Sequence, residues 1–489
     1  MVKGKDLSGR LEWRVNIPDG TSEIVETESG LVHGVWPGLK RLVLGFMLKI
    51  WKFLEKAWEL AVSEPKKVIH CVKVGVALSL VSLLYYVRPL YDGFGGNAMW
   101  AVMTVVVVFE QNVGATLSKC INRTVGTFLA GSLGVGVHWV ADKSGETFEP
   151  IILGVSVFIF ATAATFSRFI PSVKARFDYG AIIFILTFSL VSVSGYRIEK
   201  LLDLAHQRLS TIAIGTSLCI IISMFCCPIW AGDELHRLIH CNLDKLAHSF
   251  DGCVAEYFKD NTMVTVDEED SSKKIQGHRC VLNSKAAEES LANFARWEPA
   301  HGRFNFRHPW KQYLKIGATM RSCARCIETL NSCISSDTQA PEYVKKYISK
   351  VSTGLSSSSS NILKELAITM RTMKRSSKID SLVNEMNVAV QDLQNALQSL
   401  PNQLMAPSLP TAIDGSSDAK GEPETQTTTT PFAEVLPLAT FASLLIEIAS
   451  RIERIIDEVG ELASSARFKP ATDKSLRQNQ PTNSPTQDI

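Results

Sequence analysis

Excess charge is nearly absent from this sequence, and so are the motifs of soluble enzymes. The 489 residues contain 51 Lys and Arg against 49 Asp and Glu, a net charge of +2, so no global positive field indicates nucleic-acid binding. No Walker A sequence is present, which excludes an ATP-driven pump within this chain. We therefore expect neither an enzyme nor a bound cofactor. A cleavable signal peptide is not predicted either, because residues 1–35 lack a basic segment that leads into a short apolar run.

A disulfide framework is also missing. The eleven cysteines are odd in number and lie mostly in apolar or helical contexts, which is typical of free thiols in a reducing compartment. Cys323, Cys326 and Cys333 resemble a metal-binding spacing, but no second cysteine pair or histidine pair follows them. On a helix these three side chains share roughly one face, so ordinary packing is favoured and no metal is expected.

Long apolar runs, in contrast, are concentrated in one third of the chain. Each run approaches the roughly 20 residues that a helix needs to cross about 30 Å of hydrocarbon. A buried soluble core could explain one such run but hardly six within 160 residues. The six predicted spans are Val68–Val87, Asn97–Val113, Arg123–Ala141, Pro150–Phe166, Phe177–Ser194 and Leu209–Cys227.

The rest of the chain predicts helices as well, so the expected fold is all-α. We divide it into a flexible arm (1–35), an amphipathic helix (36–66), a six-helix transmembrane domain (67–228), a helical cytoplasmic domain (229–468) and a mobile tail (469–489). Residues 401–431 are expected to be a disordered insert. Periodic apolar residues predict the cytoplasmic helices Trp230–Phe258, Ser284–Arg296, Trp310–Ile334, Glu342–Met373, Lys378–Leu400 and Phe432–Phe468. Five consecutive serines, Ser356–Ser360, predict a break in the fourth of them.

The amphipathic segment has its own signature. Lys49, Lys52, Lys56 and Glu59 recur every three or four residues and so share one helical face, while tryptophans and aliphatic residues occupy the remainder. This pattern predicts a helix in the headgroup layer of a membrane. The alternative is a soluble helix that packs against the C-terminal domain.

Six spans place both termini on one side of the membrane. Five lysines precede the first span, and this excess favours a cytoplasmic location for both termini. They are Lys49, Lys52, Lys56, Lys66 and Lys67.

Cations near or within the spans point to anion transport. A charge at membrane depth is costly and persists mainly where it faces water or a partner, and a ring of cations lowers the barrier for anions. The alternative is that these cations merely follow the positive-inside bias. The candidate pore residues are Lys73, Lys119, Arg123, Arg168, Lys174, Arg176 and Arg208. Glu110, the one acid well inside a span, is expected to pair with Arg123 or Arg176, because an unpaired carboxylate there is expensive.

Several segments resemble the plant aluminium-activated malate transporter family. They are Asn97–Glu110, Val113–Gly131, Arg176–Arg197, Arg208–Gly215 and Cys227–His236. The stretch WEPAHGRF is similar to the WEP signature of that family, here Trp297, Glu298 and Pro299. Residues 122–127 also resemble the wider fusaric-acid-resistance exporter superfamily.

The resemblance implies a homodimeric anion channel that passes malate and inorganic anions across the plasma membrane or, in some members, the vacuolar membrane. It further implies outward-facing carboxylates for cation sensing at Asp92, Glu199 and Asp203, although Lys200 opposes a trivalent cation. Two other hypotheses for the function remain open. One is a proton-coupled organic-acid exporter, for which Glu110 is the one coupling candidate. The other is a membrane scaffold without transport.

Overall fold

The computed structural model describes residues 32–87, 98–145, 147–195, 201–259, 274–305, 307–334, 341–404 and 432–470. Within these ranges the chain is helical almost throughout, which confirms the all-α prediction. The strands found there are two residues each, β1 (Lys374–Arg375) and β2 (Lys469–Pro470), paired in parallel. The chain divides into two compact units, Met1–Val72 and Lys73–Ile489.

The first unit contains α1 (Val32–Ser63) and the beginning of α2 (Pro65–Tyr86). One residue, Glu64, separates the two helices. Pro65 begins α2 at a position where its missing N–H costs no helical hydrogen bond. The Glu64 carboxylate pairs with Lys67 at 2.9 Å. The junction between α1 and α2 is therefore short and locally stabilised.

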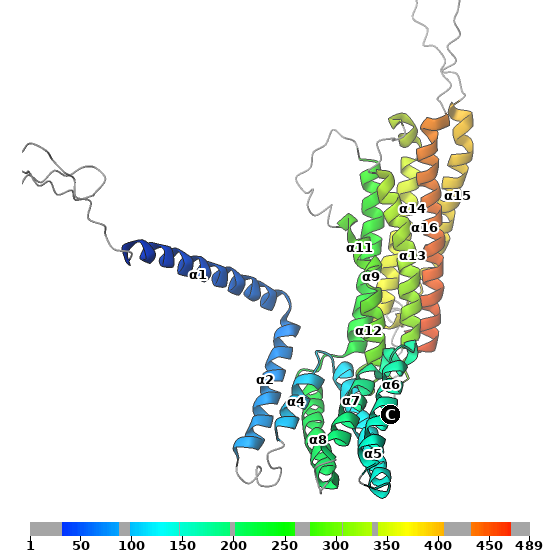
Figure 1. The fold of residues 1–489 in the computed structure, drawn as a ribbon. Coiled ribbons are helices and arrows are strands. Elements are labelled where there is room, and N and C mark those ends of the chain that lie inside the picture. The colour runs from blue at the N-terminus through cyan, green and yellow to red at the C-terminus, as the bar shows by residue number, and fades with distance from the viewer. Residues whose placement is uncertain are drawn as a thin grey trace, which may run out of the picture. The chain divides into compact units, whose positions relative to one another are not determined.

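The apolar helices of the second unit form a bundle (Figure 1). It contains α4 (Ala98–Val108), α5 (Val113–Lys143), α6 (Glu149–Ser167), α7 (Pro171–Gly195) and α8 (Leu201–Phe225). In the described part of the chain, α5, α6 and α7 are long and apolar enough to cross a membrane, and α4 and α8 contain shorter apolar helices. Three of the six predicted spans are thus confirmed in length and composition.

Glycine allows α5 and α7 to approach closely. A Cβ built on Gly126 of α5 would lie 2.7 Å from the carbonyl oxygen of Gly180 on α7, which is too close for any side chain. A Cβ on Gly134 would meet Val191 of α7 at 2.8 Å. Small residues at such crossings are typical of helix packing in membranes.

The predicted boundaries of the second and third spans are wrong. The second was expected to reach Val113, but α4 ends at Val108, and α5 begins at Val113, ten residues before the expected Arg123. The cause is a cap supplied by distant residues: the N–H of Val113 donates to the carbonyl of Ile229 at 2.9 Å. Lys119 and Arg123 consequently lie inside α5, not in the loop before it or at its start.

The remaining helices pack around one hydrophobic core (Figure 1). They are α9 (Ala231–Tyr257), α11 (Gly277–Leu282), α12 (Lys285–Ala295), α13 (Trp310–Ile334), α14 (Glu342–Thr372), α15 (Ile379–Leu404) and α16 (Phe432–Ser465). Most begin and end within a few residues of the predicted bounds, and α13 matches them. Leu243 and Phe250 of α9 and Ile316 and Met320 of α13 are fully buried in this core.

The predicted break at Ser356–Ser360 is also wrong, because α14 runs through the five serines without interruption. The hydroxyls of Ser356 and Ser360 donate to α9, to the Asp251 carboxylate at 2.9 Å and to the Ala247 carbonyl at 2.8 Å. Serine is small enough to let α9 and α14 pack closely, and these bonds offset its low helix propensity.

Gly317 on α13 faces a buried carboxylate, and its replacement should be costly. The Glu288 carboxylate accepts hydrogen bonds from Ser284 at 2.6 Å and from Arg321, and a Cβ at position 317 would overlap with it. We expect Gly317→Ala to destabilise the protein by about 2–4 kcal/mol, by overpacking and by displacing a paired charge. The thermal midpoint of the purified full-length chain measures this effect.

Gly354→Ala is the matched control, because Gly354 is exposed in α14 and a Cβ there meets no atom within 4 Å. It should raise stability slightly, by about 0.5–1 kcal/mol. Equal midpoints for the two variants would contradict the packing that the structure shows at Gly317.

Candidate functional site

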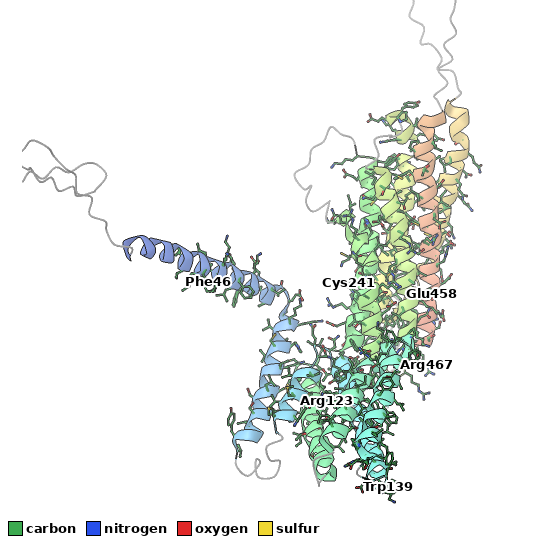
Figure 2. All side chains as sticks on the ribbon, viewed as in Figure 1. Phe46, Arg123, Trp139, Cys241, Glu458 and Arg467 are labelled. Atoms are coloured by element: carbon green, nitrogen blue, oxygen red, sulfur yellow. The ribbon has the colours of Figure 1, made fainter. Side chains whose placement is uncertain are left out.

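Arg123 is the most deeply placed of the predicted pore cations. Its side chain is 7% exposed and lines a cavity together with residues of α4, α7 and α8; Figure 2 labels Arg123 in the apolar bundle. Its Nη1 donates to the Tyr179 hydroxyl of α7 at 3.1 Å. Its Nε has no hydrogen-bond partner within the described ranges. The guanidinium therefore keeps a donor available.

A small cavity adjoins this guanidinium. Its volume is about 20 Å³, roughly that of one water molecule. The lining comes from four helices and includes Trp100, Arg123, Thr127, Ile183, Thr187 and Ile212. Arg123 thus lines a small cavity between α4, α5, α7 and α8.

Lys119 lies one turn before Arg123 on the same face of α5. Its ammonium is 5.6 Å from the centroid of the Tyr179 ring, so Tyr179 lies beside both cations. We call Lys119, Arg123 and Tyr179 the Tyr179 cluster. Tyr179 was not predicted as a site residue, because no spacing in the sequence links α7 to α5.

The prediction that Glu110 pairs with Arg123 or Arg176 is wrong. Glu110 pairs with Lys119, not with Arg123 or Arg176. The reason is the early start of α5: the turn at residues 109–112 brings Glu110 back toward the second turn of that helix, and the Thr116 hydroxyl accepts the Glu110 N–H at 3.0 Å. The expectation that Glu110 is paired is itself confirmed.

Lys73 and Arg168 each have a defined structural partner. Lys73 of α2 is buried, and its Nζ donates to the carbonyl of Cys227 at 2.8 Å, just past the end of α8. Arg168 forms a two-point ion pair with Asp178, with Nε–Oδ1 at 2.7 Å and Nη2–Oδ2 at 3.4 Å. The charge of Arg168 is therefore largely neutralised.

The remaining predicted residues are more dispersed. Lys174 and Arg176, at the beginning of α7, are exposed. Arg176 lies near Arg296, whose pKa is lowered by burial and further by the charge of Arg176. Arg208 and Asp203 belong to α8, but their side chains lie outside the described part of the structure, as do residues Asp92 and Glu199 altogether.

Glu298 of the WEP signature joins the starts of two helices. Its buried carboxylate accepts the N–H of Gly114 at 3.2 Å, of Ala231 at 2.6 Å and of Gly232 at 3.0 Å. These donors lie in the first turns of α5 and α9, where the helix dipole also favours a negative charge. Burial raises the pKa of the Glu298 carboxyl above its usual value, because it outweighs the lowering by the three N–H donors and His301.

The neighbours of Glu298 strengthen this joint. Trp297 packs edge-on against Phe177 of α7, with ring centroids 6.3 Å apart. His301 stacks on Trp230 at 3.9 Å. The turn at residues 297–301 therefore contacts the apolar bundle and the beginning of α9 together. It connects the core of the C-terminal helices to α5 and α7, the two helices that carry the Tyr179 cluster.

Two buried histidines beside this joint should make the stability depend on pH. Burial, followed by the charge of His240, lowers the pKa of His236 to about 4, and burial lowers that of His308 to about 4. Both rings contact the Tyr313 hydroxyl, at 2.9 and 3.1 Å. In the unfolded chain a histidine titrates near 6.5, so between pH 6.5 and 4 the unfolded state binds more protons.

The free energy of unfolding should therefore have its full value above about pH 6.5. It should fall as the pH is lowered toward 4, by up to about 3 kcal/mol per histidine. Thermal midpoints of the full chain between pH 7 and 5 test this dependence. His236→Gln combined with His308→Gln should flatten the pH profile, whereas an unchanged slope in that variant would assign the dependence to other groups.

A comparison with known proteins now decides the family. The family model described as aluminium activated malate transporter matches residues 58–413 and 407–463, most of the chain. The chain belongs to the aluminium-activated malate transporter family. This result confirms the resemblance noted in the sequence and, with the apolar helices of the bundle, identifies a membrane protein.

Relatives in this transporter family cover nearly the whole chain. The protein named aluminum-activated malate transporter 10 of Arabidopsis thaliana is 55% identical over 96% of this chain and 97% of its own length. The protein named aluminum-activated malate transporter 2 of Arabidopsis thaliana is 46% identical over 86% and 80%. A wheat (Triticum aestivum) relative named aluminum-activated malate transporter 1 is 41% identical over 91% and 90%.

Proposed function

We propose that this chain is a gated anion channel that passes malate and other organic and inorganic anions down their electrochemical gradient. The observation that carries this proposal is Arg123, a buried guanidinium whose Nε has no partner among the described residues and which lines a water-sized cavity. Such a charge is expensive unless an anion or water compensates it.

The ion pairs around Arg123 support anion passage and not charge neutralisation. Glu110 is taken by Lys119 and Asp178 by Arg168, and no ion pair to Arg123 occurs among the residues that the structure describes. The charge of Arg123 at this cavity is therefore not neutralised by a described carboxylate, and an unneutralised positive charge favours anions and repels cations. Arginine is also suited to two-point contact with a carboxylate such as that of malate.

The pairing of Glu110 weighs against a proton-coupled exporter. A carboxylate that shuttles protons must be free to exchange them with water or substrate, whereas Glu110 is held in an ion pair with Lys119. Passive conduction needs no such residue, so the channel is the better-supported of the two transport mechanisms.

The joint at Glu298 supports gating from the cytoplasmic helices. It bonds the first turn of α9 to the first turn of α5, and α5 carries Lys119 and Arg123. In the proposed channel, a movement of the cytoplasmic helices is passed through α5 to Arg123.

The proposed assembly is a homodimer with cytoplasmic termini, in the plasma membrane. It draws on the family membership and on the lysines before α2.

Voltage clamp of cells that express the chain tests the function, with malate, nitrate, sulfate and chloride exchanged on each side and the series repeated with added aluminium. Currents that follow the anion supplied are expected, and the absence of anion-dependent current would overturn the proposal.

A further inference from the structure

The helix α1 is not accounted for by the proposed conduction path. The family match begins at residue 58, so it also leaves most of Val32–Ser63 without an assignment. From residue 43 onward, where its side chains are described, the polar residues are confined to about one third of its circumference at three- and four-residue spacing. They are Lys49, Lys52, Glu55, Lys56, Glu59 and Ser63.

Large apolar side chains occupy the wide remaining arc and are exposed. Trp51 and Trp58, seven residues apart, border the polar arc on one side and are 70% and 73% exposed. Phe46 and Phe53, again seven apart, border it on the other and are 62% and 71% exposed. Figure 2 labels Phe46 on this helix. A surface of this size is too apolar to remain in water, so something covers it.

The position of the aromatic rings indicates what that partner is. Tryptophan rings are enriched at the boundary between headgroups and acyl chains, where an amphipathic ring meets both environments. In α1 they flank the lysines on the helix circumference. This order of apolar arc, aromatic border and charged arc is that of a helix lying in the interface plane.

Charge complementarity favours an anionic bilayer. Between Trp36 and Lys67 the chain has seven Lys and Arg against three Glu, an excess of four positive charges in a protein whose net charge is +2. Basic residues near an anionic surface are each attracted to it. A second copy of the chain would bring the same excess and repel it.

The junction with α2 restricts how far α1 can move. Glu64 alone separates the two helices, and its carboxylate pairs with Lys67 at 2.9 Å. Since α2 was predicted as the first membrane span, a one-residue connection keeps α1 at the depth where that span enters the bilayer.

We propose that α1 lies in the headgroup layer of an anionic bilayer, with its tryptophan and phenylalanine arc toward the acyl chains and its lysine arc toward phosphate groups and water.

Photo-crosslinking of the full-length protein tests this placement. A benzoylphenylalanine probe is placed at Phe53 on the apolar arc or at Glu59 on the polar arc. The protein is reconstituted in vesicles of phosphatidylcholine, alone or with added phosphatidylserine. We expect lipid adducts at position 53 in several-fold excess over position 59, and a further increase with phosphatidylserine.

Charge variants provide the matched controls. Lys49→Gln, Lys52→Gln and Lys56→Gln together should remove the increase caused by phosphatidylserine, whereas Glu55→Gln should retain it. Adducts between position 53 and a second copy of the chain would overturn the proposal in favour of a dimer contact. Equal lipid adducts at positions 53 and 59, or yields independent of phosphatidylserine, would also overturn it.

Discussion

Arg123→Gln is expected to reduce the malate current at least tenfold. At an effective dielectric constant of about 20, an anion about 4 Å from the guanidinium gains about 4 kcal/mol, and each 1.4 kcal/mol lost at a rate-limiting barrier is a factor of ten. Glutamine keeps much of the volume but removes the charge. Arg123→Lys should retain a larger share of the current, since it preserves the charge but not the two-point geometry.

Two controls separate charge from structure in this experiment. Tyr179→Phe removes the hydroxyl that accepts the Arg123 Nη1 donor and leaves the positive charge in place, so most of the current should remain. Arg168→Gln combined with Asp178→Asn removes an ion pair without changing the net charge, and should also conduct. If Arg123→Gln gives the same current as the unmodified protein at equal surface abundance, Arg123 does not lower the barrier for the permeant anion.

Glu298→Ala is expected to destabilise the protein by about 4 kcal/mol and to abolish most of the current. The change leaves three buried N–H groups without an acceptor, and each such group costs about 1–3 kcal/mol. At about 2–4 °C per kcal/mol for a domain of this size, the thermal midpoint should fall by roughly 10 °C. Glu298→Gln keeps one acceptor oxygen and should lie between.

Glu289→Ala on the neighbouring helix α12 is the matched control. This carboxylate is exposed, and among the described residues its one ion pair is a 4.0 Å contact with Lys285. Its midpoint and current should be nearly unchanged. A Glu298→Ala protein with an unaltered midpoint would contradict the hydrogen bonds described at the joint. An altered midpoint with full current would show that the joint is structural and does not act on the conducting path.

The sequence predicted the helices well because their apolar periodicity is local information. The predicted bounds of α13 match the structure, and the fold class follows from the same pattern. The start of α5 could not be predicted in this way. Its first N–H groups are satisfied by Ile229 and Glu298, which lie more than a hundred residues further along the chain.

The candidate site shows the same division between local and distant information. The cost of charge at membrane depth placed Arg123 among seven candidate cations, and the structure shows that its side chain is buried. The partners of the cations were not predictable: Glu110 meets Lys119 because of the turn before α5, and Tyr179 approaches Arg123 from α7. The five serines wrongly predicted a break in α14. Hydrogen bonds from Ser356 and Ser360 to α9 outweigh the low helix propensity of serine.

The reversal potential under a malate gradient tests the central claim most directly. With malate as the main permeant anion and opposing pH gradients imposed in separate runs, a passive path for a dianion predicts a shift of about 30 mV per tenfold change in malate. The shift should be independent of the pH gradient. A reversal potential that follows the pH gradient, or malate uptake without current, would contradict passive anion conduction.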